Sequence, residues 1–239
     1  SESLGLPNYD WAVGGAAGDA LLRTVPSAVA QVESVVAQVK SYTTYMASAP
    51  NYKPQNTLFT MLIGANDLIT YGQTPATAVA AEEMALNALI ESGARYIGVG
   101  NLPALWKAPE YRLRREGERT VLKGQIEEFN ARLSTLVATL RAQATAKQVA
   151  LSIELFDIQS AVDDMLANPE RYGVTNTSES CLDLPESSVS NYLNAHALRP
   201  SCADPDRFLF WDLLHPTTSA HRVIGEQAAA LVRAKFPLQ

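Results

Sequence analysis

Thr57-Leu-Phe-Thr-Met-Leu-Ile63, followed at once by Gly64-Ala-Asn-Asp67, is the stretch of this sequence that decides the fold. Apart from its two threonines the first segment is apolar, which is typical of a strand covered on both faces of a parallel sheet. The glycine and the polar residues that follow predict a turn at the carboxyl end of that strand. In open parallel sheets ligands bind beyond these ends, so the same stretch indicates where a functional site should lie.

Strand-like and helix-like segments alternate on both sides of this stretch. The further expected strands are Tyr9–Val13, Tyr96–Gly100 and Val149–Phe156, and the expected helices are Val25–Met46, Thr74–Ser92, Glu118–Ala144 and Thr217–Lys235. Alternation of this kind requires crossover connections, and it predicts a parallel sheet within an α/β sandwich. The stretch 168–206 is rich in Ser, Pro and Asn, and it is expected to be a long loop insertion that contains both cysteines.

Composition and charge exclude several classes of function. The chain has 239 residues, 47% of them hydrophobic, and 19 Lys and Arg against 25 Asp and Glu give a net charge of −6. This acidic balance argues against a nucleic-acid partner, which is bound through clustered basic residues. No apolar run approaches the ~20 residues of a membrane-spanning helix. The Gly-rich phosphate-binding motifs of nucleotide-binding proteins are absent, so a nucleotide cofactor is not expected.

Asp212 and His215 are the strongest candidates for catalysis. Their three-residue spacing can bring a carboxylate under an imidazole, which fixes the tautomer of a general base. The alternative is a loop that starts a helix, with Asp212 as its cap. Two ligands do not make a metal site, so no metal is expected. His196 and His221 are expected to be surface residues.

Two glycines and an asparagine follow expected strands and are candidates for anion recognition. The Asn66 amide could donate into an oxyanion hole, and the flexible backbone at Gly14 and Gly15 could present N–H groups to the same oxygen. The alternative is ordinary turn chemistry, in which Asn66 or Asp67 caps the next helix.

Cys181 and Cys202 lie in one polar stretch, which favours a disulfide over two unrelated buried thiols. A bridge that closes a loop of this size contributes about 3 kcal/mol and persists only in an oxidising compartment. We therefore expect a secreted, extracellular or periplasmic protein. Ser1-Glu-Ser-Leu-Gly5 has no signal-peptide pattern, but a mature secreted chain would also lack one.

Several blocks taken in order resemble the SGNH, or GDSL-type, esterase and lipase family. They are Asp10–Gly18, Gly64-Ala-Asn-Asp67, Gly93-Ala-Arg95, Asn101–Leu105, Glu128-Phe-Asn130 and Trp211–Thr217, and they cover nearly the whole chain from Leu4 onward. The resemblance implies a three-layer α/β/α sandwich with a parallel, flavodoxin-like sheet, spanning residues 1–239 as one domain.

The resemblance also implies a hydrolase that cleaves carboxylic, lipid or acetyl esters without a cofactor or metal. Asp212 would orient His215, which would be the base that activates a serine. Gly15, with Gly14 as the second choice, and Asn66 would form the oxyanion hole, and Asp67 is a secondary candidate. The substrate would be a small-molecule, lipid or glycan ester.

The family's nucleophilic serine lies in a Gly-Asp-Ser block at the end of its first strand, and that block is absent here. Ser1 and Ser3 lack a preceding strand, and Ser27 and Ser219 are typical of helix starts. We therefore expect the 239 residues to be part of a longer polypeptide that supplies the first strand and the serine. The alternative is a catalytically inactive domain that binds an ester or glycan ligand.

Overall fold

The structure is a computed structural model that describes residues 4–5, 9–19, 33–185 and 194–236. The chain divides into two compact units. Unit 1 comprises Ser1–Leu102, Gln125–Phe156 and Arg233–Gln239, and unit 2 comprises Pro103–Gly124 and Asp157–Val232. Each unit is described by itself, and the expectation of one domain over residues 1–239 stays a prediction.

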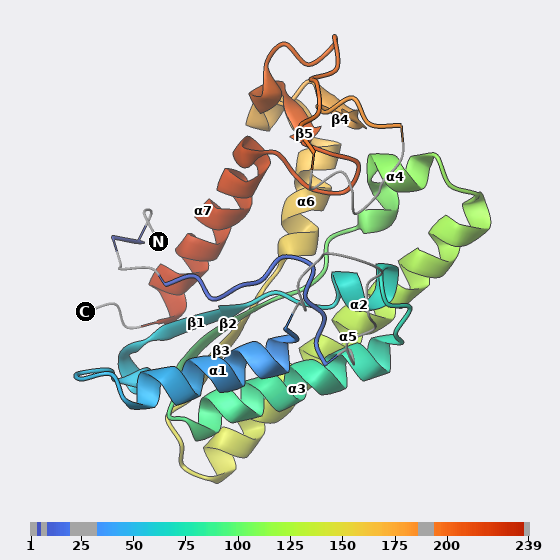
Figure 1. Ribbon diagram of the computed structural model, residues 1–239. Coiled ribbons are helices and arrows are strands. Elements are labelled where there is room, and N and C mark those ends of the chain that lie inside the picture. Colours follow the sequence, from blue (N-terminus) through green and yellow to red (C-terminus); the bar gives the residue numbers. More distant parts are fainter. Residues whose placement is uncertain (1–3, 6–8, 20–32, 186–193, 237–239) are drawn as a thin grey trace. The chain divides into compact units, whose positions relative to one another are not determined.

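Unit 1 is built on a parallel sheet (Figure 1). Its strands are β1 (Leu58–Met61), β2 (Tyr96–Gly100) and β3 (Ser152–Phe156), in the order β1-β2-β3. Both pairings are parallel, with β2 in the middle and almost wholly buried. The predicted α/β class with a parallel sheet is confirmed.

The prediction that 57–63 is covered on both faces is wrong. Among the described residues β1 pairs only with β2, so β1 lies at an edge of the sheet. Thr60 is exposed, and Leu62 just beyond the strand is 56% exposed. An apolar sequence indicates that a strand prefers to be buried. It does not indicate which strands or helices will cover it.

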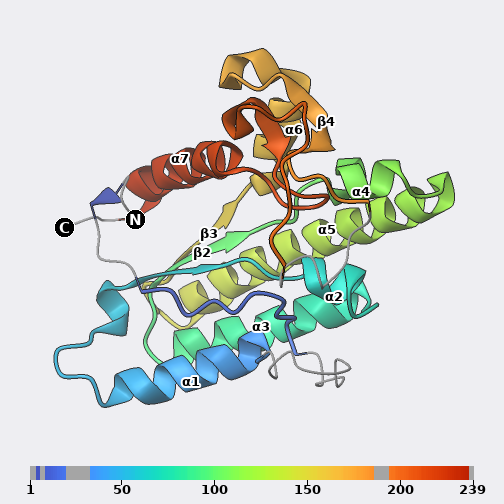
Figure 2. The ribbon, with the colours of Figure 1, turned by 45° about the horizontal axis from the view of Figure 1, so that its top comes forward.

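The helices of unit 1 begin and end where their sequences supply caps. They are α1 (Val35–Ala47), α2 (Ala65–Ile69), α3 (Pro75–Glu91) and the larger part of α5 (Glu116–Ala146). Helices α1 and α3 lie side by side in Figures 1 and 2. The Ser34 and Thr74 hydroxyls accept the N–H groups of Ala37 and Thr77, which is normal N-capping. Gly93, at φ 105°, follows α3 as expected.

Helix α5 buries the apolar stripe that its sequence predicts. Ile126, Phe129 and Leu133 are 0% exposed, and Leu136, Val137 and Leu140 are also buried. A residue at every third or fourth position places these side chains on one face of the helix.

Two expected elements in the first 46 residues differ from the structure. Residues 9–13 form no strand, because local contacts replace a ladder: Asp10 Oδ1 accepts the N–H of Ala12, and Ala16 N donates to Val13 O. The helix expected over Val25–Met46 begins only at Val35, after the Ser34 cap. Residues 20–32 lie outside the described residues.

Unit 2 contains the short helical segments η3 (Leu105–Lys107), α4 (Pro109–Arg112), η4 (Pro169–Tyr172) and η6 (Pro205–Arg207), the helices α6 (Ile158–Ala167) and most of α7 (Thr218–Lys235), and the strands β4 (Asn176–Ser180) and β5 (Phe208–Phe210). Strands β4 and β5 pair in parallel. The stretch 168–206 is therefore not all loop, since it holds η4 and β4. No helix among the described residues is long and apolar enough to cross a membrane.

Candidate active site

The loop between β5 and α7 carries Asp212 and His215 and is closed by its own backbone. Trp211 N donates to His215 O at 2.8 Å, and Phe210 and Pro216 form an isolated antiparallel bridge. Thr217, which is buried, then accepts the N–H of Ala220 at the start of α7. The five residues 211–215 are thus held in a tight turn between a strand and a helix.

Asp212 binds both the backbone and the ring of His215. Its Oδ1 accepts the backbone N–H groups of Leu214 and His215, both at 2.7 Å. Its Oδ2 lies 2.8 Å from His215 Nδ1. The structure therefore brings together the pair that the sequence spacing predicts. It also shows Asp212 binding loop N–H groups, as the alternative interpretation expects, so one carboxylate does both.

The electrostatics of this pair favour a charged carboxylate beside a basic imidazole. Burial alone would raise the pKa of Asp212, but the hydrogen bonds from His215 and Leu214 outweigh burial and lower it. The hydrogen bond to Asp212 raises the pKa of His215 above its ordinary value, although burial opposes this rise. With Nδ1–H donating to Asp212, the lone pair of the neutral ring lies on Nε2. That is the tautomer a general base requires.

The two other histidines, His196 and His221, also lie in unit 2. His221 is exposed on α7, and burial and the nearby His215 lower its pKa. His196 is half-buried. Within the described ranges no group of three or more His, Cys, Asp or Glu side chains could hold a metal ion.

The glycine-rich segment of unit 1 is fixed by side chains of α2 and its neighbourhood. Asn66 Nδ2 donates to Ala16 O at 3.0 Å, and the Gly18 N–H lies 3.0 and 3.1 Å from the two Asp67 oxygens. Tyr71 Oη donates to Gly15 O at 3.2 Å. The backbone from Gly15 to Gly18 is therefore held at three points, which suits a loop that must present N–H groups in a fixed direction.

Small residues are required where this segment packs. Gly15 has φ 85°, which glycine adopts at little cost. A Cβ on Gly18 would lie 2.6 Å from Ala81 Cβ, and one on Gly64 would lie 2.5 Å from the Phe129 ring. Gly14 precedes this fixed stretch and is exposed.

The roles of Asn66 and Asp67 differ in part from the expectation. One N–H of the Asn66 amide is used by Ala16 O, and the amide carries a second N–H for a ligand. Asp67, expected either to cap a helix or to be a secondary candidate for the site, is 2% exposed and binds Gly18, 49 residues away. Within unit 1 the structure thus ties Asn66 to Ala16, the neighbour of Gly15, and within unit 2 it pairs Asp212 with His215.

Comparison with known proteins identifies the family of this chain. Residues 1–228 match the family described as GDSL-like Lipase/Acylhydrolase. The chain belongs to this family. The resemblance noted from the sequence is therefore confirmed, and so is the α/β fold that it implied.

Relatives of this GDSL-family chain include a bacterial hemolysin and plant esterases. It is 35% identical over 229 residues to "Thermolabile hemolysin" of Vibrio parahaemolyticus serotype O3:K6 (strain RIMD 2210633), covering 95% of this chain and 52% of the relative. It is 30% identical over 143 residues to "GDSL esterase/lipase At1g06990" of Arabidopsis thaliana, covering 57% of this chain and 38% of the relative. The chain thus spans about half, or less, of these relatives.

A disulfide joins Cys181 to Cys202 in the GDSL-family chain, with the two Cα atoms 5.2 Å apart, as the sequence predicts. Cys181 N donates to Phe210 O, and Leu182 N donates to Trp211 O, both at 2.9 Å. The segment that follows β4 therefore runs directly beside the strand and loop that lead to Asp212. The sequence carries no signal for this pairing.

Of the four serines considered as nucleophiles, Ser219 lies among the described residues. Ser219 is at the start of α7, as expected, and its Oγ contacts Thr217 Oγ1 and Asp206 O at 3.0 and 3.3 Å. Ser1, Ser3 and Ser27 lie outside the described residues.

Proposed function

We propose that this chain is the larger part of a serine ester hydrolase whose nucleophile lies in a segment outside the 239 residues. The observation that carries the proposal is the 2.8 Å contact between His215 Nδ1 and Asp212 Oδ2, in a loop that Asp212 also holds by two backbone N–H groups. This geometry supports a role for His215 as a base, and not only a role for Asp212 as a helix cap, because a cap does not require a contact with an imidazole. Membership of a lipase and acylhydrolase family supports the same reaction class.

The proposed reaction is acyl transfer to a serine and then to water. His215 Nε2 takes the proton of the serine hydroxyl as the oxygen attacks the ester carbonyl, and Asp212 stabilises the imidazolium. The Gly15 N–H and the second Asn66 N–H hold the oxyanion, each donor contributing about 3 kcal/mol in the transition state. His215 then protonates the departing alcohol, and a water molecule activated by the same base releases the acid.

The edge of the sheet supports a missing strand. Strand β1 has a neighbour on one side only among the described residues, and Leu62 beside it is 56% exposed. A further strand that ends in Gly-Asp-Ser would pair with this edge and cover Leu62. Unpaired backbone groups and exposed apolar side chains are what such a strand would remove.

The disulfide and the segment it closes support two finer proposals. A Cys181–Cys202 bridge is sustained in an oxidising compartment, so the protein is secreted, extracellular or periplasmic. Because Leu182 pairs with Trp211, residues 181–183 form one wall of the substrate site next to His215. The substrate is a small-molecule, lipid or glycan ester.

The test compares the chain of 239 residues with the full-length polypeptide. The shorter chain should show no hydrolysis of p-nitrophenyl acetate above buffer and no labelling by a fluorophosphonate. The full-length protein should show both, with the label on a serine of an upstream Gly-Asp-Ser. Labelling of a serine within the 239 residues would refute the proposed source of the nucleophile. A full-length protein without labelling, but with saturable ester binding, would identify an inactive ligand-binding domain instead.

Variants of the full-length protein test the assigned roles. His215→Ala should lower kcat about 10³-fold or more, and Asn66→Ala about 10²–10³-fold with little change in KM. His221→Ala is the matched control, because His221 is a histidine in the first turn of α7, near His215, that has no role in the proposal. If His221→Ala abolished activity and His215→Ala did not, the assignment of the base would be wrong.

A further inference from the structure

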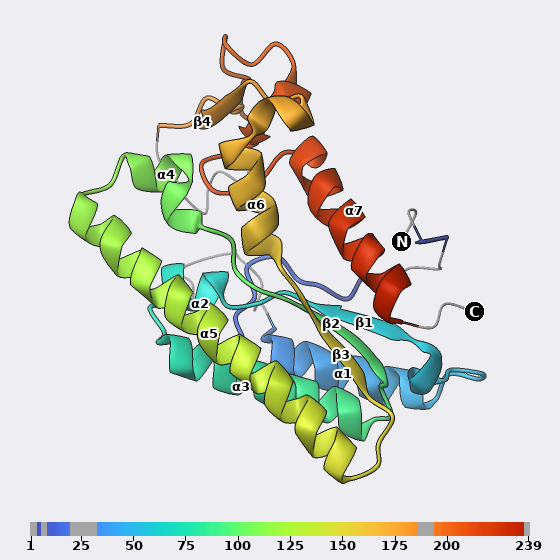
Figure 3. The ribbon, with the colours of Figure 1, turned by 180° about the vertical axis from the view of Figure 1, so that it is seen from behind.

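Unit 2 contains a groove of about 540 Å³ that none of the proposed catalytic residues lines. It lies between the start of α5, the η3–α4 segment, α6 and β4, and Figure 3 shows α4 between the first turn of α5 and α6. Four of its lining side chains are basic and one is acidic. The charged set is Lys107, Arg112, Arg119, Lys123 and Glu116. A formal charge of 4 − 1 = +3 in one groove stands out in a chain whose net charge is −6.

One wall of the groove is a single face of α5. Glu116, Arg119 and Lys123 are spaced by three and four residues, so their side chains project from the same side of the helix. Arg119 is half-buried. Among the described residues its side chain makes no hydrogen bond or ion pair, so its charge is open to a ligand.

The opposite wall holds its cations in place by contacts that only partly neutralise them. Arg112 Nε donates to Lys107 O at 3.0 Å, and its NH2 group donates to Thr177 O at 3.1 Å. Both acceptors are uncharged carbonyls, so the guanidinium is fixed while its charge remains. Lys107 Nζ pairs with Asp163 at 2.6 Å and lies 6.0 Å from the centre of the Trp106 ring. Because these side chains are already ordered, binding an anion would cost less conformational entropy.

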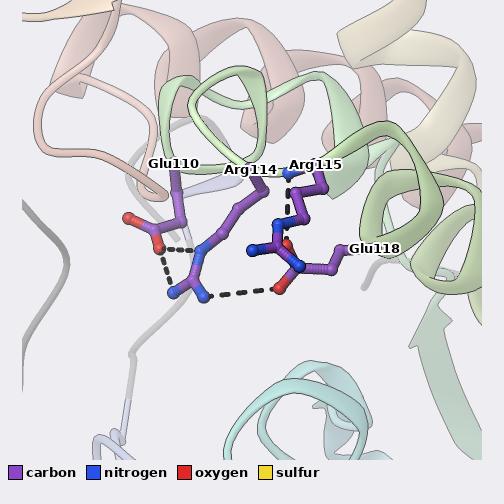
Figure 4. Close-up of polar contacts among 4 residues, drawn as sticks. All are labelled: Glu110, Arg114, Arg115 and Glu118. Carbon is purple, nitrogen blue, oxygen red and sulfur yellow. Dashed lines mark hydrogen bonds and ion pairs between the residues drawn. The ribbon is translucent and has the colours of Figure 1, made fainter.

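The acidic residues around the α4–α5 junction are occupied elsewhere. Figure 4 shows Glu110 and Glu118 on either side of Arg114, at 2.6 and 3.6 Å. Glu118 also accepts the N–H of Arg115 at 3.2 Å. These carboxylates pair with Arg114, which does not line the groove, whereas Glu116 is the acidic side chain that does.

We propose that this groove binds a phosphate group, either as free phosphate or as the headgroup of an anionic lipid. The guanidinium groups of Arg112 and Arg119 suit a tetrahedral anion with several acceptor oxygens, because arginine binds phosphate through paired N–H donors. A ligand that carries only one carboxylate would leave part of the positive charge of the groove without a counter-charge. The inference is independent of the proposed ester hydrolysis.

The test measures binding to the full-length protein at low ionic strength. Inorganic phosphate should bind saturably by calorimetry and raise Tm, whereas chloride at matched ionic strength should not. Arg119→Gln should weaken phosphate binding about 10- to 100-fold, the loss of one charge-assisted contact. Glu116→Gln should strengthen it about 2- to 5-fold, because a partly screened repulsion is removed.

Arg132→Gln is the matched control. It removes the same charge from the same helix, but Arg132 lies outside the groove and pairs with Glu128 at 2.7 Å. Its effect on phosphate affinity should stay under about 2-fold, the size of a screened surface charge. If Arg119→Gln were to misfold, Arg119→Lys provides the comparison, because the lysine keeps the charge and loses the paired N–H donors.

Vesicles distinguish the two sources of phosphate. Binding to phosphatidylcholine vesicles that contain phosphatidylglycerol, but not to phosphatidylcholine alone, and competition by inorganic phosphate would identify a lipid headgroup. Phosphate binding without vesicle binding would identify a soluble ligand. Absence of saturable binding to either probe, or equal weakening by Arg119→Gln and Arg132→Gln, would overturn the proposal.

Discussion

Asp212→Asn separates the electrostatic role of this carboxylate from its structural role. The amide keeps an oxygen where Oδ1 accepts the N–H groups of Leu214 and His215, both at 2.7 Å. It places an uncharged group where Oδ2 meets His215 Nδ1 at 2.8 Å. The loop should therefore keep its shape while the pKa of His215 falls. Asp212→Ala should lose both the loop hydrogen bonds and the raised pKa of His215.

The stability effect should depend on pH in a defined direction. The raised pKa of His215 stabilises the folded state at pH values below the unfolded pKa of about 6.5, and this is lost as pH rises through the folded pKa. The lowered pKa of Asp212 stabilises it above the unfolded pKa of about 3.9, and this is lost as pH falls through the folded pKa. The pair therefore contributes most between about pH 4 and pH 6.5.

The size of the effect follows from exposure and from the charge of the acceptor. The His215 side chain is 55% exposed, so the ion pair itself is discounted to about 1 kcal/mol or less. Two backbone hydrogen bonds change from a charged to a neutral acceptor, which costs roughly 0.5 kcal/mol each. Asp212→Asn should thus destabilise by about 1–2 kcal/mol near pH 5.5, and Asp212→Ala by about 1 kcal/mol more.

The assay is an NMR titration of the His215 ring together with urea unfolding at pH 5.5 and pH 9. Asp204→Asn is the control, because Asp204 is an exposed acidic residue of the same unit that pairs with Arg207 at 3.6 Å. It should leave the pKa of His215 almost unchanged. An unchanged His215 pKa in Asp212→Asn, or a larger destabilisation at pH 9 than at pH 5.5, would refute the reasoning.

Three further changes test other parts of the fold. Glu82→Gln should stabilise the chain increasingly above pH 5, because burial and then Asp67 raise the Glu82 pKa and folding is opposed as pH rises; unfolding at pH 5 and pH 8 checks this. Gly64→Ala should cost about 2–4 kcal/mol, since its Cβ would meet an aromatic ring at 2.5 Å, whereas Gly124→Ala in open space on α5 should be neutral or stabilising. Reduction of the bridge between residues 181 and 202 should lower stability by about 3 kcal/mol, measured by unfolding with and without reductant.

Sequence reasoning succeeded where the deciding contacts are local. Asp212 and His215 are three residues apart, so a turn is enough to join them. The stripe from Ile126 to Leu140 needs only helical periodicity, and strand β2 matches its predicted bounds, Tyr96–Gly100. Such features depend on short-range geometry that residue types and spacing determine.

Sequence reasoning failed where a contact or an exposed surface depends on segments that are far apart in the chain. Nothing in the residues around Asp67 indicates that it binds Gly18, because the contact depends on how α2 packs beside a segment 49 residues earlier. The exposure of Leu62 likewise depends on which strands flank β1 rather than on its apolar sequence.

The three bonds that hold the glycine-rich segment also bear on the order in which this molecule folds. They join residues 50, 49 and 56 positions apart, namely Ala16 to Asn66, Gly18 to Asp67 and Gly15 to Tyr71. Closing loops of this length carries an entropic cost that is met before the contacts form, whereas the turn at Asp212 closes over three residues. We expect the turn that holds His215 to form early during refolding and the glycine-rich segment to become fixed late. Native-like secondary structure would then precede recovery of a competent site.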